Sequence, residues 1–165
     1  MNNLTHIIDS KLWLAPLAGF TDQAFRQLCK ANGADVLVSE MVSADGLIRD
    51  SIKTVQYIKF SDTERPLGIQ IFGSDPVVMA RAAEFCLQYK PDFIDLNMGC
   101  PVKKVVKRGA GSALMKDPQR AAAIVREVKA ALAGLVPLGA KIRSGWNSAP
   151  PNARRAPGLR IHFDR

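Results

Sequence analysis

One cysteine, Cys100, stands in this chain where a side chain with an exchangeable proton could do chemistry. It follows by three residues the end of a short apolar strand pattern, which begins at Phe93 and stops at Asn97, and it is fixed between a glycine and a proline. Four cations come next within six residues, namely Lys103, Lys104, Lys107 and Arg108. A protonatable sulfur at a strand end, beside a cationic loop, indicates chemistry on a polyanion.

The bulk composition describes one folded, non-membrane domain. The chain has 165 residues, of which 47% are hydrophobic and 23% charged, and this suits a single packed core. No apolar run approaches the roughly 20 residues that span a bilayer, and the N-terminus lacks a secretory pattern. The three cysteines, Cys29, Cys86 and Cys100, have no metal-type spacing. They are interpreted as free thiols of a cytoplasmic protein without a metal site.

The net charge of +8 favours a partner that carries phosphates, although a basic but inert surface would give the same total. The distribution of the cations decides between the two, because they gather at 103–108 and again at 143–165. We therefore expect a nucleic acid or a phosphorylated cofactor. The oligomeric state is left open.

Short apolar runs alternate with helical patterns along the chain. Strands are expected at 12–15, 35–39, 67–72, 93–96 and 137–142. A helix after Thr21 or Asp22 is expected to bury Phe25, Leu28 and Cys29. Two later helices begin at Asp75-Pro76 and Asp117-Pro118, with an acidic cap before a proline. This alternation predicts a parallel sheet covered by helices.

Two architectures fit that order: an open doubly wound sheet and a (β/α)8 TIM barrel. The first turn, 15–20, is not a G-x-G-x-x-G motif, which weakens the dinucleotide-binding alternative. Polar residues recur at successive strand ends, as the active site of a barrel requires. We predict an α/β fold of the (β/α)8 type with only about the first five strands present. Residues 1–147 would form this partial barrel, and 148–165 a divergent basic tail rich in Pro and Arg.

Five ordered motifs make the chain resemble a known family. They are APLAGFTD at 15–22, SEM at 39–41, IQIFG at 69–73, DLNMGCP at 95–101 and KIRSGW at 141–146. Together they resemble the tRNA-dihydrouridine synthases, closest to the bacterial B-type branch. The resemblance implies a barrel that uses FMN and NADPH to reduce the C5–C6 double bond of particular uridines in tRNA. It also implies that residues 1–147 are a partial flavin-binding catalytic domain.

The resemblance also implies roles for matching positions. Pro16, Leu17 and Ala18 would line the isoalloxazine ring of the flavin. Gln70 and Lys141 would hydrogen-bond that ring and hold negative charge near its N1–C2 region. Gln70 and Lys141 also stand out without the resemblance, because each interrupts an apolar strand.

For the substrate, the resemblance implies that Asn97 holds the uracil against the flavin and that Cys100 gives a proton to C5 as hydride reaches C6. A thiol ordinarily has a pKa near 8.5, so it can serve as an acid at neutral pH. A nucleophilic cysteine would instead need an adjacent base, and the only histidines, His6 and His162, are distant in sequence. This favours the acid.

The cations Lys103, Lys104, Lys107 and Arg108 are expected to contact RNA phosphates, which position the substrate without reading its sequence. A solvated basic loop is the plain alternative. The segment has no phosphate-cradling glycine motif.

Two carboxylates receive no catalytic role. Glu40 is expected at the surface or at a helix cap, and Asp95 is expected to be structural, bonded to a neighbouring loop. Cys29 and Cys86 are expected in the core.

After Trp146 the family pattern stops, and three prolines fall within 150–157. We expect a truncated, frame-shifted or divergent end, and hence weak FMN binding by this chain alone. Two other functions stay open: an inactive homologue that only binds RNA, and a different FMN barrel that acts on a small molecule.

Overall fold

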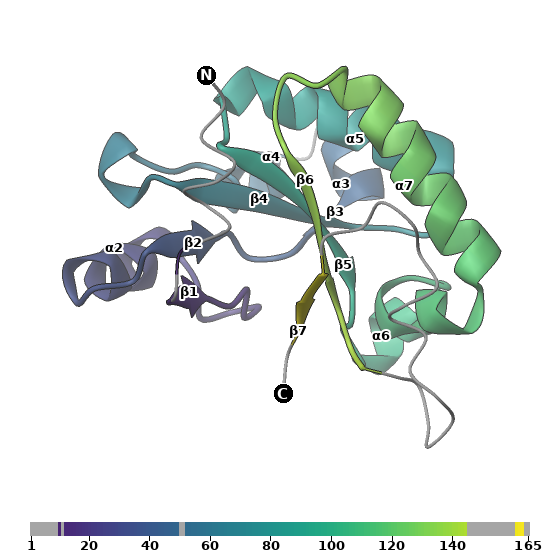
Figure 1. Ribbon diagram of the computed structural model, residues 1–165, viewed down its shortest axis with the longest axis horizontal. Helices are drawn as coiled ribbons and strands as arrows, with labels where there is room; N and C mark the ends of the chain where they lie inside the picture. The colour runs from purple at the N-terminus through teal and green to yellow at the C-terminus, as the bar shows by residue number, and fades with distance from the viewer. Residues whose placement is uncertain (1–9, 11, 50–51, 145–160, 164–165) are drawn as a thin grey trace.

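The computed structural model describes residues 10, 12–49, 52–144 and, for the backbone only, 161–163. One curled, wholly parallel sheet forms its centre (Figure 1). The strands are β1 (Trp13–Leu14), β2 (Val36–Val38), β3 (Val42–Ser43), β4 (Leu67–Phe72), β5 (Phe93–Met98), β6 (Leu138–Ile142) and β7 (Ile161–Phe163). Their order is β1-β2-β4-β5-β6-β7, and β3 pairs with the carboxyl end of β4.

The strand order decides between the two predicted architectures. Neighbours in the sheet follow one another along the chain, without the reversal that a doubly wound sheet contains. The sheet also curls enough for side chains of separated strands to meet on its concave face. The rings of Trp13 on β1 and Phe93 on β5 lie 5.6 Å apart, although β2 and β4 run between these strands. The fold is therefore a partial (β/α)8 barrel, as the sequence predicted.

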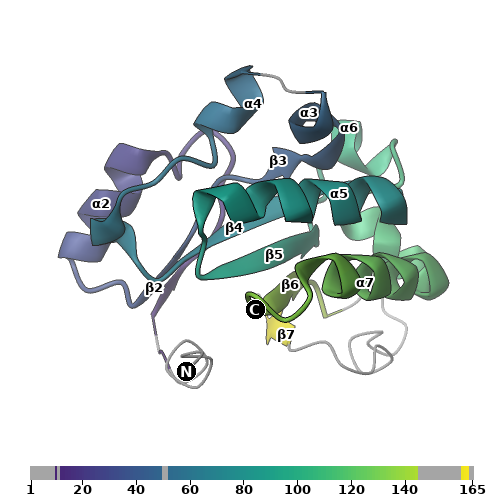
Figure 2. The ribbon, with the colours of Figure 1, turned by 90° about the horizontal axis from the view of Figure 1, so that it is seen from above.

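Helices cover the convex face of the sheet. They are α2 (Gln23–Ala31), α3 (Ala44–Ile48), α4 (Ile52–Gln56), α5 (Pro76–Cys86) and α7 (Pro118–Leu132). The short helix α6 (Lys103–Val106) lies instead beyond the carboxyl end of β5 (Figure 1). The 3-10 helices are η1 (Asp62–Glu64), η2 (Leu87–Tyr89) and η3 (Gly111–Lys116). Figures 1 and 2 show α5 and α7 side by side along this face. Asp75 and Asp117 cap them as predicted, with their Oδ1 atoms 2.9 Å from Val78 N and 3.0 Å from Arg120 N.

Alternation along the strands separates the core from the site. On β5, Ile94, Leu96 and Met98 join the buried cluster beneath α5 and α7. The residues between them, Asp95 and Asn97, face the concave side, where alternate residues of a half-barrel must point. All five predicted strands are present. The short strands β3 and β7 were not predicted.

The helix after Asp22 forms, but its predicted buried face was wrong. Phe25 and Leu28 are 39% and 60% exposed, whereas Arg26 on the same helix is 2% exposed. Arg26 can be buried because Nε lies 2.7 Å from Glu64 Oε2 and its other nitrogens donate to the carbonyls of Thr21 and Lys59. A guanidinium paired in this way meets the condition under which charged groups enter a core. Cys29 is half-buried, packed against the core, and Cys86 is fully buried.

The segment after Cys100 is more ordered than a loop. Residues 103–106 form α6, which buries the side chain of its own Val105, and η3 begins at Gly111. The predicted tail, 148–165, lies outside the described residues apart from the backbone of β7, which pairs with β6. The proposed division at residue 147 therefore stays a prediction.

Candidate active site at the carboxyl ends of the strands

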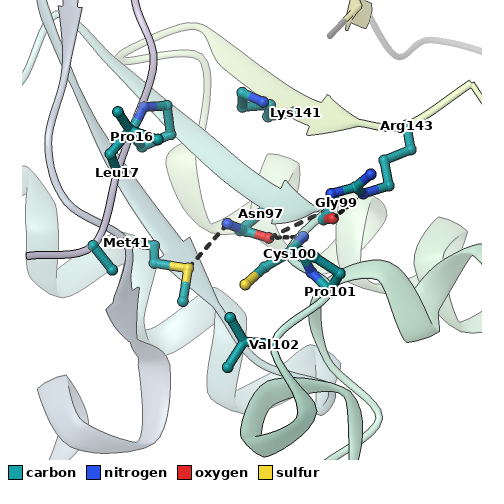
Figure 3. A pocket seen from close by; sticks show the side chains of 11 residues that line it. Pro16, Leu17, Met41, Asn97, Gly99, Cys100, Pro101, Val102, Lys141 and Arg143 are labelled. Atoms are coloured by element: carbon teal, nitrogen blue, oxygen red, sulfur yellow. Dashed lines mark hydrogen bonds between the residues drawn. The ribbon is translucent and has the colours of Figure 1, made fainter. Parts of the chain in front are cut away.

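A cavity of about 300 Å³ opens where the carboxyl ends of β1, β5 and β6 meet (Figure 3). Its walls come from Pro16, Leu17, Ala18, Met41, Asn97, Gly99, Cys100, Pro101, Val102, Lys141 and Arg143. Six of the residues predicted for the site thus come together here: Pro16, Leu17, Ala18, Asn97, Cys100 and Lys141. Their convergence follows from the parallel sheet, which brings the carboxyl ends of all strands to one edge.

The thiol of Cys100 belongs to this cavity. Figure 3 shows its sulfur pointing toward the space between Met41 and Val102. The backbone around it is held from both sides. Cys100 N donates to Asn97 Oδ1 at 3.0 Å, and Cys100 O accepts from Ser112 N at 3.0 Å. Gly111 makes the second contact possible, because its φ is +61° and a Cβ there would stand 2.7 Å from Cys100 O.

Polar side chains form the floor on the concave face. In the register of the sheet, Gln70 lies opposite Asp95, and Asn97 lies opposite Lys141. Gln70 Nε2 donates to Asp95 Oδ2 at 2.5 Å, and Asn97 Nδ2 donates to Gln70 Oε1 at 2.8 Å. Gln70 is fully buried and is not part of the cavity wall, so it lies one layer below the residues with which it was grouped.

Two of these groups have displaced pKa values. Burial raises the pKa of Asp95 to about 7, against the opposing effects of the Gln70 hydrogen bond and the Lys141 charge. Burial lowers the pKa of Lys141, opposed by Asp95 and assisted by Arg143. From the sequence, Asp95 was expected to have a structural role toward a neighbouring loop. The structure instead bonds it to a neighbouring strand, through Gln70.

The raised pKa of Asp95 predicts a pH dependence of stability. Between about pH 4 and 7 the folded state keeps a proton that the unfolded state releases, so the unfolding free energy should fall as pH rises. The slope from one such proton approaches about 1.4 kcal/mol per pH unit and vanishes above the folded pKa. Urea unfolding from about pH 4.5 to 8 should show this component in the parent protein and not in Asp95→Asn. Equal slopes in both proteins would contradict it.

The loop after β1, which forms the apolar wall, is fixed by side chains that the sequence analysis did not select. Thr21 Oγ1 lies 2.9 Å from Leu17 N and 3.0 Å from Leu17 O. Glu40, 6% exposed, accepts from Gly19 N at 2.5 Å. The expected surface or helix-cap role of Glu40 was therefore wrong, because the carboxylate lies under this loop. The only available signal was its position directly after a buried strand.

Arg143 belongs to the KIRSGW motif at 141–146, but no role in the site was assigned to it from the sequence. It lines the cavity, and its Nε donates to Gly99 O at 2.6 Å, so it braces the loop that carries Cys100. With Lys141 it makes this side of the cavity cationic. An apolar wall from 16–18 opposite two cations can hold a flat aromatic ring that carries negative charge.

The cations in and directly after α6 stand outside the cavity. Lys103, Lys104, Lys107 and Arg108 are exposed and begin directly after Val102 at its rim. They therefore add positive charge to the surface beside the cavity. Within the described part of the chain, no three His, Cys, Asp or Glu side chains gather as a metal ion would require. No helix in that part has the length and apolarity to span a bilayer.

The family model for dihydrouridine synthase (Dus) matches residues 13–155. A tRNA-dihydrouridine synthase B of Shewanella oneidensis is 46% identical over 139 residues, which are 84% of this chain and 42% of the relative. The corresponding protein of Pseudomonas aeruginosa is 42% identical over 142 residues, 86% of this chain and 42% of the relative. A probable tRNA-dihydrouridine synthase of Treponema pallidum is 38% identical over 146 residues, 86% of this chain and 43% of the relative. The chain thus spans about two fifths of the length of these relatives.

Proposed function

Because the chain belongs to the dihydrouridine synthase family, we propose that its cavity serves the reduction of uridine in tRNA to 5,6-dihydrouridine, with FMN as cofactor and NADPH as reductant. The observation that carries this proposal is the position of the Cys100 thiol. It shares one cavity with the apolar wall at 16–18 and with Lys141. A proton donor, a surface for a flat ring and a cation for its charge are what this reduction needs.

The cavity suits the ring of the cofactor. Pro16, Leu17 and Ala18 offer a flat, largely apolar wall, and Lys141 stands in the same cavity as a cation for the electron-rich edge of the ring. Gln70 is also proposed to bind the flavin ring. Because its amide is buried, a direct contact requires a movement that exposes it to the cavity. When bound, reduced FMN supplies the hydride that is added to C6 of the uracil.

The residues of the chain account for the other half of the addition. As hydride arrives at C6, negative charge develops at C5, and the Sγ–H of Cys100 breaks to give C5 its proton. The thiolate that remains takes a proton from water, so the thiol is restored. Asn97 would orient the uracil with the amide N–H that donates to Met41 Sδ at 3.2 Å, because a thioether is a weak acceptor that the substrate can replace. In the same proposal the two electrons come from NADPH.

The exposed cations in and directly after α6 are proposed to bind tRNA. The target uridine must leave its stack to reach the cavity, at a cost of a few kcal/mol. Phosphate contacts from Lys103, Lys104, Lys107 and Arg108, next to the rim, would hold the RNA where it opens. Since tRNA is a cytoplasmic molecule, we propose that the protein acts in the cytoplasm.

The proposed function is tested by direct product analysis. Purified protein is incubated with NADPH, unmodified tRNA and enough FMN to saturate a weak site, and the tRNA digest is analysed by mass spectrometry. A uridine heavier by about two daltons, formed only when FMN and NADPH are both present, supports the proposal. Bound tRNA that stays unreduced in the presence of both would overturn it.

A charge variant tests the RNA contacts. Lys103→Ala with Lys104→Ala should weaken tRNA binding and lower the slope of log K against log salt by about 1.5, since each lost phosphate contact removes about 0.7–0.9. The matched control, Arg126→Ala with Lys129→Ala on the exposed side of α7, removes the same charge far along the chain from the rim. If both double variants lower the slope equally, the proposed phosphate contacts of Lys103 and Lys104 are refuted. A substrate without phosphates would show no such slope.

A further inference from the structure

A row of three hydrogen-bonded side chains, Asn97, Gln70 and Asp95, leads from the loop that carries the Cys100 thiol into the half-barrel. The donor-to-acceptor direction of its hydrogen bonds is fixed. Asn97 Oδ1 accepts hydrogen bonds from Gly99 N at 3.3 Å and from Cys100 N at 3.0 Å. A backbone N–H can only donate, so the oxygen of the Asn97 amide must face the loop. Its nitrogen must then face the interior of the half-barrel. The orientation of this amide follows from its neighbours.

The orientation of the Asn97 amide in turn fixes the orientation of the next amide, that of Gln70. Asn97 Nδ2 lies 2.8 Å from Gln70 Oε1, so Gln70 must present its oxygen to Asn97 and its nitrogen to the next group. That group is Asp95, whose Oδ2 accepts from Gln70 Nε2 at 2.5 Å. The row starts at two groups that only donate and ends at Asp95 Oδ2, which accepts from Gln70 and leaves Oδ1 to carry the proton that the carboxyl group holds below about pH 7. Reversing any one amide would set donor against donor at one end.

Burial leaves these groups few other partners. Gln70 is 0% exposed, Asp95 4% and Asn97 7%, so water can replace little of the row. The fold also keeps space for the carboxylate. Gly139 stands opposite Asp95 on β6, and a Cβ there would lie 3.1 Å from Asp95 Oδ1. The charge of Lys141, two residues further along β6, favours the ionised carboxylate.

We infer that Asp95 is a positioning residue for Cys100, acting through Gln70 and Asn97 to hold the loop that carries the thiol. Its relevance to catalysis rests on the proposed function, in which Cys100 gives its proton at a defined point in the cavity. The hold on the loop does not depend on the reaction. Asp95 is two residues from Asn97 in sequence, but it reaches the loop by way of the neighbouring strand β4.

An Asp95→Asn variant tests the inference with little change of shape. Aspartate offers one oxygen to Gln70 and keeps a second oxygen beside Gly139 and Lys141. Asparagine has a single oxygen for both sides, so residue 95 no longer enforces the direction of the row from its inner end. Amide hydrogen exchange is measured by NMR on the whole chain. In the variant, exchange at Gly99 and Cys100 should be about tenfold faster than in the parent protein, whereas α7 amides such as Ala121 should exchange at nearly the parent rate.

A second variant disturbs the same carboxylate without changing charge. Gly139→Ala places a methyl group against Asp95 Oδ1 and should give the same local pattern. If Asp95→Asn fails to fold, Gly139→Ala decides the question alone. Uniform acceleration at all protected amides, or unchanged exchange at Gly99 and Cys100, would overturn the inference and leave Asp95 as an ordinary buried polar group.

Activity gives a separate readout. If the protein reduces tRNA, Asp95→Asn should lower kcat about tenfold and leave KM for tRNA unchanged, since Asp95 is buried and cannot touch RNA. A parent protein without reductase activity would refute the proposed function, and the exchange result would still decide whether Asp95 holds the thiol loop. The two failures are thereby distinguishable.

Discussion

Replacing Cys100 with alanine is expected to slow dihydrouridine formation by about 100- to 10,000-fold, the range lost when a positioned general acid is removed. Among the described residues that line the cavity, Cys100 carries the one thiol, and no histidine, tyrosine or carboxylic acid there could take its place. The two cations that line the cavity have other roles: Lys141 is proposed to contact the flavin ring, and Arg143 holds the loop that carries Cys100.

The matched control is Cys29→Ala, which removes the same atom from a half-buried position on α2 that does not line the cavity. It should keep nearly all of the activity. The affinity of Cys100→Ala for tRNA should stay within about twofold of the parent value, because the phosphate contacts are assigned to the cations at 103–108. A variant that retains most of the reduction rate would remove Cys100 from the mechanism. A loss of tRNA affinity equal to the loss of rate would make it a binding residue.

The elements that the sequence predicted best are those whose pattern is local. The runs at 67–72 and 93–98 are apolar on one side and carry Gln70, Asp95 and Asn97 on the other, which is the pattern of strands in a curled sheet. The position of the site followed from topology. Parallel strands end at one edge, so Pro16, Asn97 and Lys141 had to approach one another.

Depth along the barrel axis was not predictable in the same way. A period of two shows that Gln70 points inward, but it does not show how far below the rim it lies. Depth depends on the register between strands, which pairs Gln70 with Asp95 and Asn97 with Lys141. Two residues that look equivalent in sequence, Gln70 and Lys141, therefore occupy different layers. One is sealed and the other lines the cavity.

Long-range ion pairs were the other feature that the pattern could not reveal. Arg26 lies in a helix whose apolar residues, Phe25 and Leu28, predicted a different face as buried. Its partner, Glu64, is 38 positions away in the short 3-10 helix η1. An isolated arginine on a helix is usually exposed. The burial of Arg26 is explained only by its ion pair with Glu64, which the three-dimensional structure brings next to it. Glu40 was missed for a related reason, since its partner is the backbone of Gly19.

The Arg26–Glu64 pair gives the largest expected change in stability. Both side chains are at most 2% exposed, and Arg26 also donates to the carbonyls of Thr21 and Lys59, at 2.9 Å each. Arg26→Met should lower the unfolding free energy by about 3–5 kcal/mol, because the Glu64 carboxylate stays buried without its counter-charge. Thr21 holds the Leu17 backbone, so the same variant should also loosen the apolar wall of the cavity. Urea unfolding measures the first effect.

Two comparisons separate the charge effect from the loss of a long side chain. Arg120→Met removes an arginine of the half-exposed pair with Asp117 and should cost at most about 1 kcal/mol. Glu64→Gln combined with Arg26→Met removes both charges, while the new amide oxygen can still accept from Ser61 N, which donates to Glu64 in the parent protein. The double variant should therefore lose clearly less than the sum of the two single changes, with a coupling of at least about 1 kcal/mol. Additive losses, or an Arg26→Met cost no larger than that of Arg120→Met, would show that the buried pair does not hold α2 and the β1 loop in place.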